Sequence, residues 1–303
     1  MLKSYLRLFL KGVAMGAADV VPGVSGGTIA FITGIYEELI SSISAINIHA
    51  VKLLFSGQFK NAWTYINGKF LAVLFAGVFT SIMTLASLLT YLLEHFPIVV
   101  WSFFFGLVTA SIWLVGRTVR EWNVITILSL TIGAIIAYMI TILPASDGAS
   151  EPWYLILCGA LAICAMILPG ISGSFILLLL GAYSTVLAAV SDRELSTIMY
   201  VGIGAVLGLV FFTKALKWIF LNYYNTTIAM LSGFLLGSLN KLWPWKEIIT
   251  FFTKHEGTPK EEIVAITSTN LSPGPEWPVA LLCACAGGLL VLLLERFGKR
   301  ERE

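Results

Sequence analysis

Two short segments of this chain combine hydroxyl side chains with a helix-breaking Pro-Gly pair. The first reads Pro22-Gly23-Val24-Ser25-Gly26-Gly27, and the second, 147 positions later, reads Pro169-Gly170-Ile171-Ser172-Gly173-Ser174. Proline presets a turn and glycine frees the backbone, so each serine is expected at the start of a returning half-helix. Hydroxyls, free backbone N–H groups and the positive end of the helix dipole converge there. Such an arrangement binds anions, and phosphate fits it well.

The expected anion-binding residues come from both segments, because broken helices at corresponding positions of two halves indicate a transporter binding site at their interface. The alternative is that glycine and serine only allow membrane helices to pack closely. Two copies at matched positions favour binding. The residues expected to contact the anion are Ser25, Gly26, Gly27, Thr28, Ser172, Gly173 and Ser174.

Charged residues in apolar sequence are expensive and usually functional, and two of them are candidates for a role in this protein. Asp19 precedes Pro22 by three residues and aligns with Met166 in the second copy. We interpret it as a candidate for coupling to an ion, with capping of the loop backbone as the alternative. Lys214 aligns with Met83 and could supply positive charge to the phosphate, or its ammonium group could extend to the membrane surface. No metal site, cofactor or catalytic group is expected from the spacing of the histidines and cysteines.

The composition indicates a polytopic membrane protein. The 303 residues are 58% hydrophobic and 12% charged, with a mean hydropathy of +0.89, whereas a soluble domain has about 25% charged residues. The net charge of +2 is spread over short loops, so a nucleic-acid partner is not expected.

Membrane-spanning helices need about 20 mainly apolar residues. Two further apolar regions, 12–50 and 154–190, contain the Pro-Gly segments, and each could be two full spans or a re-entrant hairpin. Re-entry is favoured, because irregular backbone at membrane depth is tolerated only where protein covers it. The six segments that qualify as full spans are 70–93, 98–116, 123–143, 198–221, 227–243 and 277–295.

Loop charges give the expected orientation. Twelve of the nineteen basic residues fall on one side, in the N-terminus, the 51–69 loop, the 117–122 loop and the C-terminal tail, which marks that side as cytoplasmic. Three spans per half is an odd number, so the second half must be inverted. Whether the stretch 37–55 crosses the membrane or lies on it stays open.

The predicted fold is therefore an all-α, polytopic membrane protein made of an inverted repeat. Residues 1–147 and 148–303 form the two halves, each with one re-entrant helical hairpin and three transmembrane helices. The segment 244–276 is expected to be an external loop. Further matches support the repeat: Gly12 with Gly159 at the same offset, and Ser102–Leu107 with Gly233–Ser238 at an offset of 131.

The runs from Gly16 to Thr28 and from Ile167 to Phe175 resemble the PopT family of bacterial polyprenyl-phosphate transporters. The resemblance covers essentially the whole chain, including Gly237-Ser238-Leu239 and Trp243-Pro244-Trp245. It implies a protein of the bacterial plasma membrane that returns undecaprenyl phosphate, the lipid carrier of cell-envelope precursors, across the membrane by alternating access. The implied partners are this polyprenyl phosphate lipid and the surrounding membrane lipids.

Other classes of function stay open at this point. Undecaprenyl-diphosphate phosphatases of the BacA type have a related Pro-Gly-x-Ser-Arg-Ser motif, but this chain has Gly26 and Gly173 in place of the arginine. Phosphoryl transfer needs cationic stabilisation, so we expect no enzyme. An ion-coupled carrier of another anion is a further alternative, and a purely structural membrane protein is the least favoured. The coupling ion, proton or sodium, and the oligomeric state, including a homodimer, are open.

Overall fold

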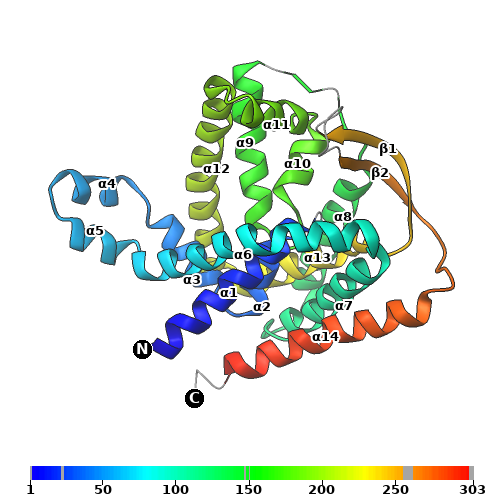
Figure 1. Ribbon diagram of the computed structural model, residues 1–303. Coiled ribbons are helices and arrows are strands. Elements are labelled where there is room, and N and C mark those ends of the chain that lie inside the picture. Colours follow the sequence, from blue (N-terminus) through cyan, green and yellow to red (C-terminus); the bar gives the residue numbers. More distant parts are fainter. Residues whose placement is uncertain (1, 22–23, 147, 150, 255–261, 300–303) are drawn as a thin grey trace.

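The computed structural model describes residues 2–21, 24–146, 148–149, 151–254 and 262–299 (Figure 1). Helices dominate this part of the chain, as expected for the all-helical class. In the first half, three helices surround the first Pro-Gly segment, two short helices form an excursion, and three long helices follow. These are α1 (Leu2–Val20), α2 (Gly26–Ile32), α3 (Tyr36–Ser44), α4 (Ile48–Phe55), α5 (Phe59–Tyr65), α6 (Gly68–His95), α7 (Pro97–Gly116) and α8 (Val124–Ile142).

The second half has the same order of helices, without the short excursion. Three helices surround the second Pro-Gly segment, and three long helices follow, the last of them after a pair of strands. These elements are α9 (Pro152–Ile167), α10 (Gly173–Leu179), α11 (Tyr183–Ser191), α12 (Leu195–Asn222), α13 (Tyr224–Leu242), β1 (Lys246–Lys254), β2 (Glu262–Asn270) and α14 (Trp277–Lys299).

Corresponding helices of the two halves agree in length and in their breaks. Helices α2 and α10 each have 7 residues, and α6 and α12 each have 28. The residue that separates α6 from α7, Phe96, has φ −134° and ψ 50°, and its counterpart Tyr223 has φ −136° and ψ 50°. Gly34 and Gly181, 147 positions apart, both have a left-handed backbone, with φ of 71° and 65°. The two halves are therefore built alike.

Glycines let the long helices approach closely, and they do so in the same way in each half. A Cβ atom on Gly12 would lie 2.2 Å from the carbonyl oxygen of Leu74 in α6, and one on Gly159 would lie 2.2 Å from that of Val201 in α12. Small residues at such contacts are typical of membrane helix packing. The offset of 147 between Gly12 and Gly159 therefore relates two equivalent positions.

The predicted offset of 131 between α7 and α13 is wrong by one helical turn. Gly106 packs against the Ala284 carbonyl of α14, and Gly233 packs in the same way against the Leu130 carbonyl of α8. Gly237 also packs in this way, against the Ala134 carbonyl, but only the offset of 127, from Gly106 to Gly233, agrees with the helix breaks at Phe96 and Tyr223. The sequence match selected the wrong register because Gly233 and Gly237 are both glycines and lie one helical turn apart.

Within the described residues, five helices are long and apolar enough to cross a membrane: α6, α7, α8, α12 and α14. The predicted span 227–243 does form a helix, α13, but it is not among these candidates. Much of α13 is buried against α7 and α8, including the polar residues Thr227, Ser232 and Ser238. A helix covered by protein need not be as apolar as one that faces lipid.

Two bent helix pairs raise the number of candidate spans in the described part of the chain to as many as seven. Helix α3 meets α4 at 58°, and α10 meets α11 at 114°, so each pair is a broken span or a re-entrant loop. The predicted region 154–190 matches α9 to α11. The region predicted as 12–50 begins earlier in the structure, because α1 starts at Leu2. Helix α3 is largely buried, whereas α4 is largely exposed and projects from the bundle with α5 (Figure 1).

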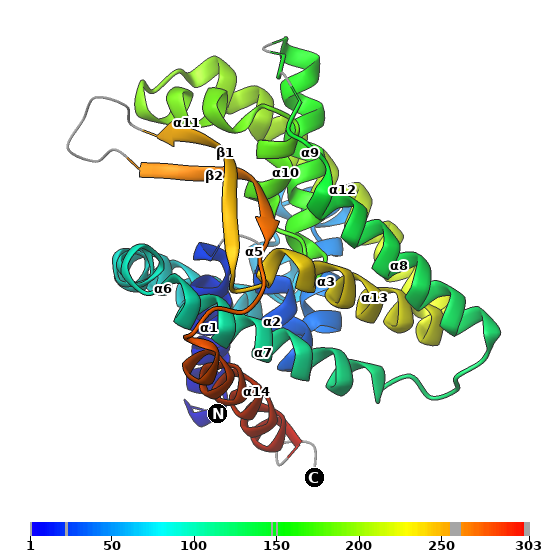
Figure 2. The same ribbon diagram turned by 90° about the vertical axis from the view of Figure 1, so that its right-hand side faces the viewer.

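The segment 244–276 was predicted as a loop, but it contains two paired strands, which the predicted all-helical fold did not include; its external position stays a prediction. Strands β1 and β2 pair antiparallel, with Lys246 opposite Asn270 and Lys254 opposite Glu262. The sequences of both strands are rich in the β-branched residues isoleucine, valine and threonine, which favour strands. The hairpin lies at the edge of the helical bundle and connects α13 to α14 (Figure 2).

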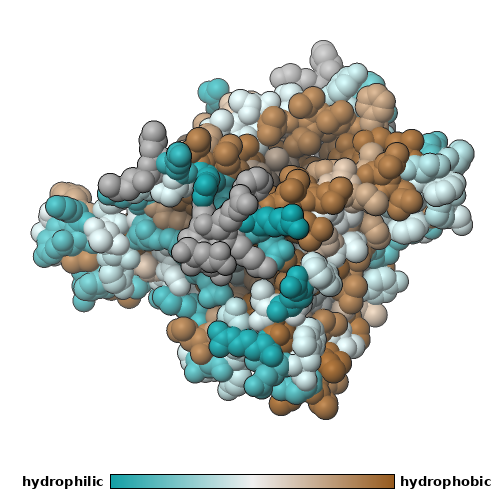
Figure 3. Space-filling model, turned by 90° about the horizontal axis from the view of Figure 1, so that it is seen from below, coloured by the Kyte–Doolittle hydropathy of each residue, from teal (hydrophilic) through white to brown (hydrophobic). Residues whose placement is uncertain are grey.

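The outer surface is hydrophobic over large areas. Large apolar side chains are exposed on the candidate spans, among them Phe79, Phe211 and Leu282. Figure 3 shows broad hydrophobic areas on the face seen from below, next to hydrophilic ones. Exposed apolar surface of this extent is expected where helices face lipid chains.

Candidate functional site

The two Pro-Gly-x-Ser-Gly segments meet in the structure. We call residues 24–28 the first tip and residues 169–174 the second tip; Pro22 and Gly23 lie outside the described residues. The hydroxyl of Ser25 donates to the Met166 carbonyl at 2.9 Å, and the backbone N–H of Gly170 donates to Thr28 Oγ1 at 3.0 Å. Tertiary structure thus joins segments that are about 140 residues apart in sequence.

The polar groups of the first tip bond within the protein. Ser25 is the N-cap of α2 in an extended conformation, and its Oγ accepts from the Gly27 N–H at 3.0 Å. An N-cap hydroxyl satisfies one of the free amides at a helix start. Ser25 and Thr28 are 1% and 0% exposed. In this conformation, the first tip is closed.

Asp19, at the end of α1, contacts the first tip directly. Its Oδ1 accepts from the Gly26 N–H at 2.6 Å. The alternative role of Asp19, capping of the loop backbone, is therefore observed. Its carboxylate accepts the hydrogen bond of an N–H group that the expected anion site would offer to phosphate. The role of Asp19 in ion coupling stays a prediction.

Glycines at both tips allow close backbone contact. A Cβ atom would lie 2.5 Å from the Ile167 carbonyl oxygen if placed on Gly27, and 2.6 Å from that of Ala162 if placed on Gly173. At Gly26 it would lie 2.6 Å from a carboxylate oxygen of Asp19. In this conformation these glycines serve close packing, the alternative that the sequence left open.

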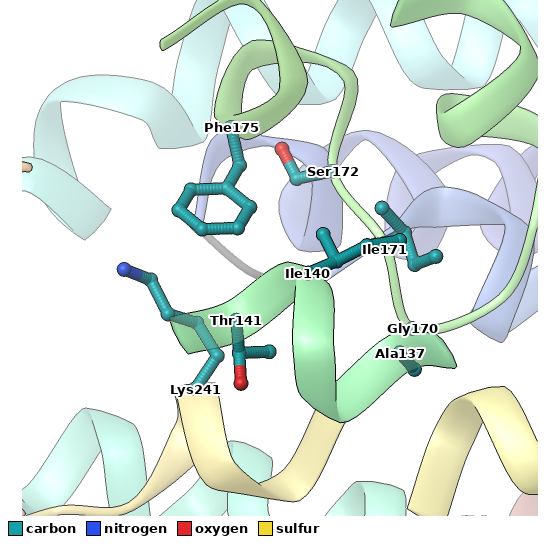
Figure 4. A pocket seen from close by; sticks show the side chains of 8 residues that line it. All are labelled: Ala137, Ile140, Thr141, Gly170, Ile171, Ser172, Phe175 and Lys241. Atoms are coloured by element: carbon teal, nitrogen blue, oxygen red, sulfur yellow. The ribbon is translucent and has the colours of Figure 1, made fainter. Parts of the chain in front are cut away.

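The second tip is more open. Ser172 precedes α10 without a side-chain cap, its hydroxyl lies 2.8 Å from that of Ser174, and Ser174 is exposed. A cavity of about 10 Å³ adjoins the tip, which is about the volume that one water centre needs. Figure 4 shows the residues that line it: Ala137, Ile140, Thr141, Gly170, Ile171, Ser172, Phe175 and Lys241. A phosphate group requires the tip or its neighbours to move.

Lys241 is a site residue that the sequence analysis did not single out. It lies in the last turn of α13, half-buried, with its Nζ 4.3 Å from the centre of the Phe175 ring of α10. Its position follows from Ser238, one turn earlier on the same helix face, whose Oγ would lie 2.8 Å from a Cβ on Gly170. The i, i+3 spacing was visible in the sequence, but the contact of Ser238 with the second tip was not.

Lys214 lies elsewhere. It is exposed on α12 and does not line the cavity, because the buried face of that helix carries Thr213, Leu216 and Phe220. The structure therefore does not bring Lys214 together with the tips, and its role in phosphate binding stays a prediction. Within the described residues, no group of three or more His, Cys, Asp or Glu side chains could hold a metal ion.

Comparisons with known proteins agree with the resemblance. A protein from Vibrio cholerae serotype O1 named "Polyprenyl-phosphate transporter" is 46% identical over 308 residues, covering 98% of each chain. A protein of the same name from Staphylococcus aureus is 34% identical over 253 residues, covering 78% of this chain and 85% of its own. No solved structure matches the chain significantly. Since residues 15–260 also match the model of the family described as "Undecaprenyl phosphate translocase-like", the chain belongs to that family.

Proposed function

We propose that this protein transports a polyprenyl phosphate, undecaprenyl phosphate, between the leaflets of the bacterial plasma membrane. The names of the family and of the two relatives support this substrate. The observation that carries the mechanism is the meeting of the two tips, because each tip has serine hydroxyls and backbone N–H groups that can donate hydrogen bonds to an anion. A charged phosphate crosses hydrocarbon only at prohibitive cost unless protein groups replace its water.

The proposed topology is an inverted repeat with halves at 1–147 and 148–303. The matched helices support it, because each half has one three-helix region around its tip and three long helices. The beginning of α1 and the end of α14 lie at the same end of the molecule (Figures 1 and 2). With the basic residues concentrated at that end, both termini are cytoplasmic and the β-hairpin faces outward. The two tips then enter from opposite sides as re-entrant segments.

The proposed transport cycle separates the tips and closes them again. In the closed conformation, Ser25 and Thr28 bond to Met166 and Gly170 across the two halves. When the tips part, Ser25, Gly26, Gly27, Thr28, Ser172, Gly173 and Ser174 become available to phosphate oxygens, while the isoprenoid chain stays in lipid. Phosphate can accept the hydrogen bond of the Gly26 N–H only when the Asp19 carboxylate no longer accepts it. Protonation of Asp19, or sodium binding to it, would release this N–H and so couple the ion to transport.

A phosphatase fits the tips poorly. The related enzymes carry an arginine where this chain has Gly26 and Gly173. A Cβ on Gly173 would lie 2.6 Å from a backbone carbonyl oxygen, so this position has no room for a larger side chain in this conformation. The tip segments themselves carry no arginine to stabilise the transition state of phosphoryl transfer, and the nearby Lys241 ammonium group lies over the Phe175 ring.

The test uses the purified protein in proteoliposomes, with the sidedness of undecaprenyl phosphate and the release of free phosphate followed in one sample. We expect movement between leaflets without phosphate release. The double variant Ser25→Ala/Ser172→Ala should lose transport and stay folded. Its matched control is Ser111→Ala/Ser232→Ala, two buried serines whose hydroxyls bond carbonyls of their own helices.

Each outcome separates the alternatives. Release of phosphate from undecaprenyl diphosphate would favour the phosphatase. Inactivity of the wild type towards undecaprenyl phosphate, with transport of a soluble anion instead, would favour the other carrier class. Unimpaired transport by the tip variant would overturn the assignment of the phosphate contacts while leaving the transporter in place.

A further inference from the structure

Two neighbouring lysines have no acidic partner within the described residues, and one of them, Lys241, lines the cavity at the second tip. Lys241 in α13 and Lys246 in β1 are both half-buried. Lys246 Nζ donates to the backbone carbonyl of Lys241 and lies 5.3 Å from the centre of the Trp101 ring, while Lys241 Nζ lies over Phe175. Within the described residues, neither ammonium group contacts a carboxylate. Two like charges are thus held together by aromatic rings and a carbonyl.

An arrangement of this kind is unfavourable without an anion. Burial removes water from both ammonium groups, and an unpaired buried charge is costly. Burial and the neighbouring Lys241 charge lower the pKa of Lys246 to about 7. Cation–π contacts compensate for only part of the hydration free energy that the ammonium groups lose. A site kept in this state fits a ligand that brings two negative charges.

We propose that Lys241 and Lys246 form the docking site through which the phosphate group of the lipid reaches the second tip from the outer side. This inference rests on the proposed function and names a cationic part of its binding site. A phosphate monoester carries about −1.5 to −2 charges near pH 7, because its second pKa is about 6. Two adjacent ammonium groups match this charge, and neither Lys214 nor the first tip supplies such a pair near Ser172.

The position of Lys241 connects the docking site to the tip. Lys241, Thr141, Phe175 and Ser172 line the same cavity (Figure 4). In that view the Phe175 ring lies between the Lys241 side chain and the Ser172 hydroxyl. Phe175 belongs to α10, so a movement of the second tip also moves the ring off the ammonium group. The phosphate then exchanges the aromatic contact for a charge-assisted hydrogen bond, which is the stronger one.

The test measures binding separately from transport. Farnesyl phosphate, a short soluble polyprenyl phosphate, is titrated into the detergent-purified full chain by calorimetry. Farnesol and inorganic phosphate are titrated as the neutral-lipid and free-anion arms. Loss of one charge-assisted hydrogen bond weakens binding roughly 10- to 100-fold, so Lys241→Gln and Lys246→Gln should each raise the Kd by this factor. Lys241→Arg should restore most of the affinity.

The control variant is Lys60→Gln, an exposed lysine on α5 far along the chain from either tip. It should bind farnesyl phosphate as the wild type does. Tighter binding of farnesyl phosphate than of inorganic phosphate would identify the lipid as the source of the phosphate group. Equal binding of the two would instead assign the lysines to a free-anion site and overturn the lipid-docking proposal.

The pH dependence of farnesyl phosphate binding separates a charge-dependent role of Lys246 from a purely structural one, because a structural role would not change the affinity with pH. The groups around Lys246 are the Lys241 cation on α13, the Trp101 ring on α7 and the neutral amide of Asn270 on β2. Raising the pH through about 7 neutralises Lys246, so wild-type affinity should fall while that of Lys246→Arg holds.

Unchanged affinity in Lys241→Gln and Lys246→Gln, in protein that still transports undecaprenyl phosphate, would overturn the docking site alone. Wild-type protein that neither transports undecaprenyl phosphate nor binds farnesyl phosphate would overturn the proposed function and, with it, this inference.

Discussion

The contact between the tips gives a direct way to change the conformational equilibrium of this protein. Thr28→Val keeps the shape of the side chain but removes the Oγ1 acceptor of the Gly170 N–H, a bond of 3.0 Å between buried groups. A buried donor left without its partner costs about 1–3 kcal/mol. If the tips separate during transport, the open conformation does not make this bond and does not suffer the loss. The variant should therefore shift the equilibrium towards the open conformation by about 5- to 150-fold.

The assay reports opening by thiol accessibility. Ile171 lines the cavity and is 6% exposed, so Ile171→Cys, in a background without Cys158, Cys164, Cys283 and Cys285, provides a probe that is covered when the tips are closed. A hydrophilic maleimide should label it faster in the Thr28→Val variant by the factor above, as long as the open population remains small. No substrate is added, so the role of Thr28 in binding does not enter the measurement.

The matched control is Thr213→Val. Thr213 is also 0% exposed, but its hydroxyl bonds the Leu209 carbonyl of its own helix at 2.6 Å. Its removal should leave the labelling rate unchanged. An unchanged rate in Thr28→Val, with folding verified by size-exclusion chromatography and thermal unfolding, would refute the reasoning that the tips separate at this contact.

Two further predictions concern the first tip. Gly27→Ala should lower the free energy of unfolding by about 1–3 kcal/mol, because its Cβ would lie 2.5 Å from the Ile167 carbonyl oxygen. Gly202→Ala, with no atom within 4 Å of its Cβ, should raise the free energy of unfolding by about 0.5–1 kcal/mol. Equal melting temperatures for both variants would contradict the close packing of the tips. Asp19→Asn should keep the fold but transport at a rate that no longer responds to a proton or sodium gradient, measured in proteoliposomes; a gradient response equal to that of the wild type would remove Asp19 as the coupling residue.

Local sequence patterns predicted the long helices well. Runs of apolar residues about 20 long must form helices in a membrane, because every backbone group has to bond within the segment. Five of the six predicted spans are candidate membrane helices, with ends within a few residues. Helix α13 was predicted as a helix, but its burial by α7 and α8 could not be read from its own residues.

The strand pair and the offset between α7 and α13 were less predictable. The segment 244–276 was predicted as a loop because of its charged residues and prolines, although both of its strands are rich in isoleucine, valine and threonine. The offset failed because Gly233 and Gly237 give the same match at two registers. The helix breaks at Phe96 and Tyr223 select the offset of 127, and the packing of Phe103 on Gly287 and of Met230 on Gly133 repeats at the same offset.

The sequence by itself determined the membrane class, the repeated Pro-Gly-x-Ser-Gly segments and the helix breaks, because these depend on local composition and on residues that cannot continue a helix. Tertiary structure decided which groups meet: Thr28 with Gly170, Asp19 with Gly26, and Lys241 with Phe175. Such contacts depend on how helices distant in sequence pack and rotate. Rotation by a single residue turns a side chain by about 100° around the helix, which separates a buried Thr213 from an exposed Lys214.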